Sequence, residues 1–402
     1  MNEPRQGRRA AVIIACGGIV LMLSIAIRSS FGIFLHPISV DLCWSRDVFA
    51  FSIALQNLFW GLSQPFAGAI ADRYGTGRVV IAGALLYAAG TMLMAATTTP
   101  AAAHITVGVM VGIGISGCGF AIVLAAVGYS VAPERCGMAM GIAAATGSFG
   151  QFAALLISQQ LLDANGWPMT FILLGLASLL IVPLAAALAG RARPVTVIAP
   201  GSFNDALGKA ARNPSFLYLN AGYFVYGFHV AFIATHLPAY IVDQGMPASL
   251  GAWALGLVGL FNVFGSFIAG VLGDRFSKKY LLSLIYFARA AVIALFVLFP
   301  VSPASILLFA AAMGLLWLST VPLTSALVAQ MFGIRYLSTL LGVVFFSHQL
   351  GGFTSAWLGG KLFVLTGSYA IGWWVSVALG VFAGLLHWPI DERPIARFAD
   401  AG

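Results

Sequence analysis

Residues 68–75 read Gly-Ala-Ile-Ala-Asp-Arg-Tyr-Gly, and residues 270–277 read Gly-Val-Leu-Gly-Asp-Arg-Phe-Ser. Each stretch ends a long apolar run at a short charged loop. Three glycines farther along repeat at nearly the same offset, since Gly141, Gly150 and Gly166 recur as Gly342, Gly351 and Gly367. A shared offset across several segments indicates an internal duplication, so the chain is predicted to consist of two like halves.

The composition is that of a membrane protein. Of the 402 residues, 60% are hydrophobic and only 8% are charged, whereas a soluble surface needs about a quarter of its residues charged. The net charge of +8 does not indicate nucleic-acid binding, because no basic stretch is long or interleaved with stacking aromatics. The four cysteines show no paired spacing, so we expect neither a disulfide framework nor a metal site.

Twelve apolar runs are long enough to cross a bilayer as helices. They span about 10–36, 47–70, 79–97, 102–131, 138–162, 169–189, 215–241, 250–272, 280–299, 303–331, 337–365 and 368–388. The sequence thus predicts an all-α membrane protein with two six-helix halves, 1–190 and 215–390. A linker, 191–214, joins them, and a tail, 391–402, follows.

The positive charges predict the orientation of the chain. With a cytoplasmic N-terminus, sixteen Lys and Arg residues fall on the inner side, and only Arg46 and Lys361 fall on the outer side. Under the positive-inside rule both termini are expected to be cytoplasmic. We therefore predict a multi-pass protein of the inner (plasma) membrane, whose main partner is the lipid bilayer, and we expect a monomer.

Twelve helices in two halves, with Gly-x-x-x-Asp-Arg after the second and the eighth, resemble the major facilitator superfamily. The resemblance covers nearly the whole chain and implies transport by alternating access. In that family the loop acid and arginines lock the inner face by charge pairing and by capping a helix end. The matching residues of this gating motif are Gly68, Asp72, Arg73, Gly75, Arg78, Asp274 and Arg275.

Within that superfamily the first half resembles the branch of monocarboxylate transporters and oxalate/formate antiporters. The matching stretches are 28–37 (Arg-Ser-Ser-Phe-Gly-Ile-Phe-Leu-His-Pro), 44–46 (Trp-Ser-Arg), 72–75 and 166–171 (Gly-Trp-Pro-Met-Thr-Phe). The animal members carry a lysine near the place of Arg28 that takes part in handling the anion. They also carry an aspartate and an arginine in the eighth helix, and residues 260–266 contain neither. Proton-coupled lactate transport by that pair is therefore not supported here.

Two arginines, Arg28 and Arg289, lie inside apolar runs, whereas all twelve acidic residues lie in loops, in tails or at helix ends. A charge inside the hydrocarbon region is costly unless it is paired or hydrated, so such residues usually mark a pathway. With no carboxylate at the same depth, the missing counter-ion is predicted to be an anionic substrate, and a carboxylate suits the guanidinium fork. The alternative is that Arg28 snorkels or bonds to backbone carbonyls, and that Arg289 reaches carbonyls or Asn262.

Other candidates for the substrate site are polar or aromatic residues near the bilayer midplane. A histidine near the midplane can titrate near neutral pH, so His229 and His348 are candidates for carrying a proton; the alternative is a neutral histidine bonded across helices. The remaining candidates are Asn57, Gln151, Tyr226, Asn262 and Gln349.

The sequence contains no nucleotide-binding loop, dinucleotide fingerprint, metal cluster or nucleophile triad, so it predicts neither an enzyme nor a cofactor. We predict a secondary active transporter of a small, monocarboxylate-like organic anion, either coupled to protons or exchanging anions. The alternatives are an exporter of neutral hydrophobic compounds and a non-transporting membrane sensor of the same fold.

Overall fold

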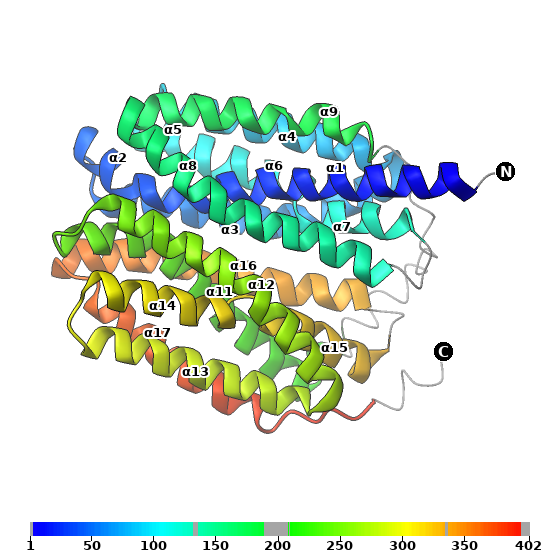
Figure 1. Ribbon diagram of the computed structural model, residues 1–402. Coiled ribbons are helices and arrows are strands. Elements are labelled where there is room, and N and C mark those ends of the chain that lie inside the picture. The colour runs from blue at the N-terminus through cyan, green and yellow to red at the C-terminus, as the bar shows by residue number, and fades with distance from the viewer. Residues whose placement is uncertain (1–2, 132–135, 189–207, 209, 334–336, 395–402) are drawn as a thin grey trace.

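The protein is a bundle of long helices, seen here in a computed structural model that describes residues 3–131, 136–188, 208, 210–333 and 337–394. No strand occurs among these residues. In Figure 1 the helices of the first half (blue to green) lie beside those of the second half (green to red). The expectation of a two-part helical membrane fold is confirmed.

The first half contains six membrane helices, several of them interrupted. In chain order its elements are α1 (Glu3–Ser29), η1 (Ser30–Phe34), α2 (Leu35–Asp41), α3 (Arg46–Tyr74), α4 (Thr76–Met94), α5 (Pro100–Ala103), η2 (His104–Met110), α6 (Val111–Cys118), α7 (Phe120–Tyr129), α8 (Cys136–Leu179) and α9 (Ile181–Ala185). The elements α1, η1 and α2 together form the first membrane helix, and α5 through α7 form the fourth. The fifth and sixth helices meet inside α8 at Gly166, where a φ of 73° turns the chain at no steric cost to glycine.

The second half repeats this order. Its elements are α11 (Pro214–Asp243), α12 (Ala248–Arg275), α13 (Lys278–Leu298), α14 (Pro303–Leu316), α15 (Thr320–Phe332), α16 (Leu337–Thr366) and α17 (Ala370–His387). Gly367, the counterpart of Gly166, lies between α16 and α17 with a φ of 70°. The duplicated glycines thus serve the same left-handed turn. Residues 191–207 and 209 of the predicted linker, 191–214, lie outside the described residues, and α11 begins at its last residue, Pro214.

Nine stretches of the described chain are long and apolar enough to span a membrane, and one of them holds both helices of α8. The two membrane helices outside this set, α3 and α16, pack against each other where the halves meet. Helices that bury polar side chains between the halves need less apolar surface than helices that face lipid. The second and eleventh helices are therefore the less hydrophobic pair.

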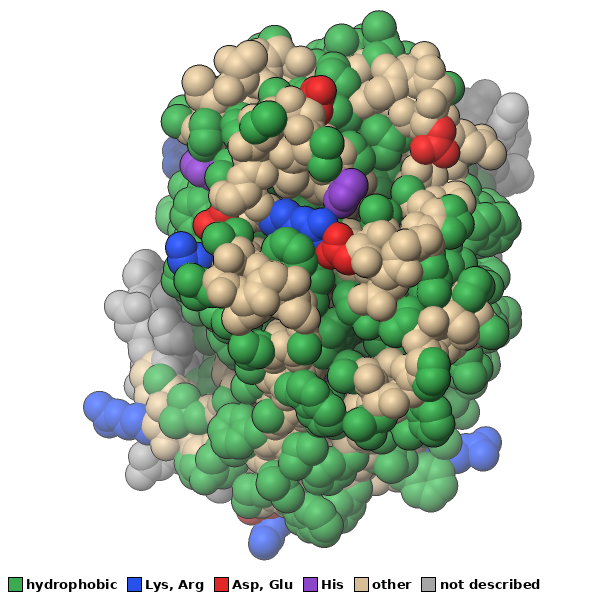
Figure 2. Space-filling view, turned by 90° about the vertical axis from the view of Figure 1, so that its left-hand side faces the viewer, with side chains coloured by type: hydrophobic (Ala, Val, Ile, Leu, Met, Phe, Trp, Pro, Cys, Tyr) green, Lys and Arg blue, Asp and Glu red, His purple; other side chains and the backbone are tan. Residues whose placement is uncertain are grey.

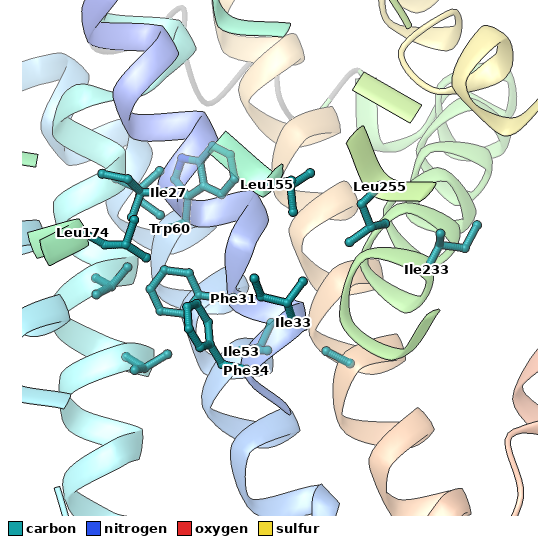
Figure 3. Packing of buried hydrophobic residues seen from close by; sticks show 14 of the residues in the cluster. Ile27, Phe31, Ile33, Phe34, Ile53, Trp60, Leu155, Leu174, Ile233 and Leu255 are labelled. Carbon is teal, nitrogen blue, oxygen red and sulfur yellow. The ribbon is translucent and has the colours of Figure 1, made fainter. Parts of the chain in front are cut away.

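Apolar packing around the first membrane helix holds its polar residues in place. Phe31 and Phe34 both contact the ring of Phe171, at centroid distances of 5.5 and 4.6 Å. Figure 3 shows these two phenylalanines together with Ile27 and Trp60 in one buried cluster. This cluster fixes the segment that carries Arg28.

We call the end of the bundle with the loops after α3 and α12 the motif end, because both copies of the gating motif lie there. The start of α1 and the segment after α17 lie at this same end (Figure 1). The other end, with the starts of α3 and α12, is the opposite end.

Candidate functional site

Arg28 lies in the last turn of α1, next to the short 3-10 segment η1. Its Nη2 donates to Oδ1 of Asn57 on α3 at 2.6 Å, and its Cζ lies 4.7 Å from the ring centroid of Trp60. The side chain stays partly exposed inside the bundle, and its Nε has no hydrogen-bond partner among the described residues. Neither contact neutralises the charge, since the amide is neutral and the indole offers only a π face.

Helix α16 presents His348 and Gln349 to the same region. The ring of His348 lies 4.6 Å from that of Tyr226 on α11 and stacks at 6.0 Å on Phe345. Phe345 in turn contacts Trp60 at 5.4 Å. An aromatic wall therefore runs from α3 in the first half through α16 to α11 in the second.

Gln349 is fully buried between the halves. A Cβ added to Gly61 of α3 would lie 2.8 Å from the Cβ of Gln349, so the glycine permits a close approach of α3 to α16. Neither the amide nitrogen nor the amide oxygen of Gln349 has a hydrogen-bond partner within the described part of the chain. Leaving a buried amide unpaired is costly, so Gln349 remains a candidate for binding a ligand.

These contacts bring five of the predicted substrate residues to one place. The ring contacts of Trp60 with Phe345 and of His348 with Tyr226 link the surroundings of Arg28 to the second half. We call the group the central cluster; it consists of Arg28, Asn57, Trp60, Tyr226, Phe345, His348 and Gln349. Sequence reasoning missed Trp60 and Phe345, although the spacing of Trp60 from Asn57, one helical turn, places both on one face of α3.

Arg289 on α13 touches this cluster but is bound elsewhere. It is completely buried, and its Nε donates to the carbonyl of Leu316 at 3.1 Å. Its Nη2 donates to the same carbonyl and to that of Trp317, the latter at 2.7 Å. The guanidinium Cζ lies 4.9 Å from the ring of Tyr226 and 5.4 Å from that of Tyr286. The geometry matches the carbonyl-bonded alternative for this arginine.

Three other predicted site residues lie apart from the central cluster. His229 is fully buried within the second half, where its Nε2 donates to the carbonyl of Ser376 on α17 at 2.8 Å. Asn262 on α12 reaches across to the first half, with its Nδ2 3.3 Å from Oγ of Ser148 on α8. Gln151 packs against Gly259 at the same contact between α8 and α12.

The fourth membrane helix of each half is broken at a corresponding place. In the first half the break is at Gly119, between α6 and α7; in the second it covers residues 317–319, between α14 and α15. A Cβ on Gly119 would lie 3.7 Å from Nε1 of Trp60, and Arg289 binds the second break. Interrupted helices at matching positions of two repeats commonly flank a transport site. The hydropathy pattern, apolar through both breaks, gave no signal of them.

The gating-motif residues lie at the motif end and are largely exposed. Gly75 joins α3 to α4 with a φ of 96°, and a Cβ on Gly68 would meet nothing within 4 Å. The exposed charged members are Arg73, Arg78, Asp274 and Arg275. No ion pair joins these four to any other described side chain; the side chain of Asp72 lies outside the described part.

The opposite end is closed by charge pairs between the halves. Arg46, at the start of α3, forms a two-pronged ion pair with Asp243, at the end of α11. Its guanidinium Cζ also lies 4.1 Å from the ring centroid of Phe363, and its Nη1 donates to the hydroxyl oxygen of Tyr369 at 3.3 Å. Figure 2 shows basic and acidic side chains together in the middle of this face. We call Arg46 and Asp243 the opposite-end lock.

Comparison with known proteins agrees with this architecture. The model of the Major Facilitator Superfamily matches residues 17–356. The chain belongs to this superfamily. Its membrane-embedded, multi-pass architecture and its assignment to transporters follow from that membership.

The relatives of this superfamily member differ in what their names say. The uncharacterized MFS-type transporter YcxA of Bacillus subtilis is 26% identical over 384 residues, covering 89% of this chain and 88% of its own. Monocarboxylate transporter 13 of Rattus norvegicus is 24% identical over 406 residues, covering 96% and 91%. The Fujikurins efflux protein of Gibberella fujikuroi is 26% identical over 354 residues, covering 85% and 72%.

Solved structures of the superfamily share the fold. The structure of the nucleoside transporter NupG superposes with a TM-score of 0.81 at 12% sequence identity, covering 94% of this chain and 99% of that chain. A bacterial homologue of the human lysosomal transporter Spinster, in an inward-facing conformation, gives a TM-score of 0.73 at 14% identity, covering 94% and 96%. At these identities the likeness concerns the fold alone.

Proposed function

We propose that this protein is a secondary active transporter of a small, monocarboxylate-like organic anion. One observation carries the proposal: Arg28 is partly exposed, its hydrogen-bond partner is the neutral amide of Asn57, and no carboxylate contacts it among the described residues. An arginine at the centre of a membrane helix costs about 2.5–3.5 kcal/mol on insertion scales. An anionic substrate at Arg28 offsets this cost.

The other members of the central cluster suit a carboxylate with a small organic body. The guanidinium binds a carboxylate through parallel N–H···O bonds, and the unpartnered Nε of Arg28 is one such donor. The amide of Gln349 offers both a donor and an acceptor to the rest of the molecule. The aromatic wall of Trp60, Phe345 and Tyr226 provides apolar contact.

Transport by alternating access suits the contrast between the two ends. The opposite-end lock is formed, while the four described motif charges are unpaired, and the central cluster draws side chains from both halves. We assign the motif end and both termini to the cytoplasm of a plasma membrane from the excess of Lys and Arg there. For coupling, either to protons or by anion exchange, His348 is better placed than His229 because it lies in the cluster.

The experiment is a thermal-unfolding screen of the purified protein with short mono- and dicarboxylates at two pH values. A monocarboxylate that binds is expected to raise the midpoint temperature, because it stabilises the folded state by RT ln(1 + [L]/Kd), where [L] is the free ligand concentration. Arg28→Gln should abolish that rise, whereas Arg275→Gln, which removes an exposed motif-end arginine, should leave it intact. If the carboxylate stabilises the Arg28→Gln protein as much as the wild type, Arg28 is not part of the binding site.

A second candidate function, export of neutral hydrophobic compounds, is favoured by relatives whose names describe efflux, such as the Agnestins efflux protein AgnL12 of Paecilomyces divaricatus, 22% identical over 397 residues. The aromatic wall would serve such cargo as well. Uncharged aromatic compounds in the same screen distinguish the two, because their binding should not depend on the charge of Arg28. A protein that binds neither class and shows no flux would fit the sensor alternative.

A further inference from the structure

Arg289 ties the break in the tenth membrane helix to the wall of the central cluster. The preceding helix, α14, ends at Leu316, and the next, α15, begins at Thr320. The last carbonyls of a helix have no partner within it, and the guanidinium of Arg289 takes up two of them, those of Leu316 and Trp317. A helix C-terminus carries partial negative charge, so the buried cation and the helix end stabilise each other.

The other side of the break is held by Asn262. Its Oδ1 accepts the backbone N–H of Leu318 at 3.0 Å, while its Nδ2 contacts Ser148 of the first half at 3.3 Å. The carbonyl side and the N–H side of the break are therefore each bound by a buried polar side chain. A break held on both sides has a defined geometry that can change only if these bonds change.

The guanidinium of Arg289 also lies between the break and Tyr226. Its Cζ is 4.9 Å from the Tyr226 ring, and Tyr226 contacts His348 of the central cluster at 4.6 Å. Arg289 itself is fully buried and uses Nε and Nη2 on carbonyls, and of its donors only Nη1 has no partner among the described residues. A carboxylate in the cluster would meet Tyr226 and His348 first, because these rings lie between the cluster and the guanidinium. This order of contacts leads from ligand to ring, from ring to guanidinium, and from guanidinium to break.

We propose that Arg289 is a positioning residue that couples occupation of the central cluster to the angle between α14 and α15, and that it is not itself an anion ligand. Movement of Tyr226 on ligand binding shifts the guanidinium, and the carbonyls of Leu316 and Trp317 move with it. The segment that responds is α15, which runs toward the motif end. This inference rests on the proposed function for its ligand, but not for the contacts of Arg289 with the break.

The test combines ligand binding with hydrogen–deuterium exchange of residues 314–324 in the purified full-length protein. The probe is whichever monocarboxylate stabilises the wild type most in the thermal screen. Arg289→Met removes the fork and the charge, and Arg289→Lys keeps the charge without the fork. Tyr286→Phe is the matched control on α13, because it keeps the ring beside Arg289 and loses only the hydroxyl bond to Gly222.

Without ligand, both Arg289 variants should speed exchange in residues 314–324 by about tenfold or more relative to Tyr286→Phe, since the carbonyl bonds that hold the break are lost. With ligand, wild type and Tyr286→Phe should gain protection in α15, and the Arg289 variants should not. Their affinity for the carboxylate should stay within about threefold of wild type.

Each other outcome overturns the proposal. Loss of carboxylate binding in Arg289→Lys as well as in Arg289→Met would make Arg289 a ligand, and ligand-induced protection that persists in Arg289→Met would mean no coupling. If no carboxylate or other compound binds the wild type, the proposed function fails. Hydrogen–deuterium exchange of the unliganded variants then tests the positioning role of Arg289 without a ligand. Unchanged exchange in residues 314–324 would then refute the positioning role by itself.

Discussion

Arg28, which is partly exposed, and Arg289, which is fully buried, both lie among apolar helices, yet the protein compensates for their charges differently. Arg289 binds the carbonyl end of α14, where the helix dipole supplies negative potential. Arg28 has only a neutral amide and an indole ring in contact. Of the two, Arg28 retains the greater capacity to bind an external anion.

The contact between Arg28 and Asn57 offers a direct test of this difference. Asn57→Asp would place a carboxylate 2.6 Å from the guanidinium and supply an internal counter-ion. An ion pair in this setting should compete with the substrate, so carboxylate affinity is expected to fall by at least about tenfold. The measurement is the carboxylate-induced rise in unfolding temperature.

Asn57→Ala is the matched control, because it removes the same hydrogen bond without adding a charge. It should lose less of the carboxylate effect than Asn57→Asp does. Equal losses in both variants would show that the amide positions Arg28, and that the charge of the counter-ion plays no part.

Sequence reasoning located the central cluster only in part. The unpaired charge of Arg28 and the polar residues of α3 and α16 are visible in the sequence, because polar side chains are rare in apolar runs. Which of them meet is not visible. His229 and His348 have similar depths in their helices, and only the rotation of α11 places His229 against Ser376 and Tyr226 against His348.

At the scale of elements, the segment after α17 fastens the motif end of the second half. The side-chain carboxylate of Glu392 accepts a hydrogen bond from the backbone N–H of Lys279 at 2.6 Å. The backbone carbonyl of Glu392 accepts one from Nε2 of Gln330 at 3.0 Å. The N–H of Asp391 donates to Ser215 at 3.0 Å. The segment therefore links the start of α11, the start of α13 and the end of α15.

Removing the Glu392 side chain should weaken the contact between the segment after α17 and the start of α13. Its carboxylate occupies the N-terminal end of α13, where free N–H groups and the helix dipole favour a negative acceptor. Glu392→Ala should lower the free energy of unfolding in detergent micelles by about 1 kcal/mol. Glu392→Gln keeps an acceptor and should lose less; an Ala variant as stable as wild type would mean that water replaces the bond fully.

The helices themselves were predictable, and their interruptions were not. Apolar runs of about twenty residues place the membrane helices, since the hydrocarbon thickness sets their length, although α3 and α16 are less apolar than the rest. The breaks at Gly119 and at 317–319 depend on side chains from other helices that satisfy the freed backbone groups. Such partners are brought together only by the fold, so Arg289 could not be assigned to a break from sequence.

At the scale of the whole molecule, the two ends are in opposite states. Arg46 and Asp243 join the halves at the opposite end, assisted by the weaker pair of Lys361 with Asp47 at 3.9 Å. Close packing reinforces them, because a Cβ on Gly360 of α16 would lie 2.8 Å from the Cβ of Ala50 on α3. The described motif charges at the other end remain unpaired. A transporter that alternates between two states would exchange one set of pairs for the other.

Asp243→Asn should therefore shift the equilibrium toward opening of the opposite end. The substitution removes the ionic partner of Arg46, whose side chain is 12% exposed. This destabilises the closed state, where the pair is formed, and leaves the open state unaffected. A loss of about 1.4 kcal/mol of pairing would raise the open population roughly tenfold. The measurement is the rate at which a membrane-impermeant maleimide labels the cysteine of Ala50→Cys. Ala50 is fully buried at the contact of α3 with α16, and a Cys43→Ser background removes the exposed cysteine at this end.

Two variants make this measurement specific to the lock. Asp243→Glu preserves the charge and should label nearly as slowly as the parent, and Lys361→Met removes only the longer, exposed pair and should have a small effect. Equal labelling of Asp243→Asn and Lys361→Met would show that seam packing at Gly360 and Ala50, and not the ion pair, keeps this end closed. Faster labelling of Asp243→Asn alone would assign the closing interaction to Arg46 and Asp243, because the packing is the same in both proteins.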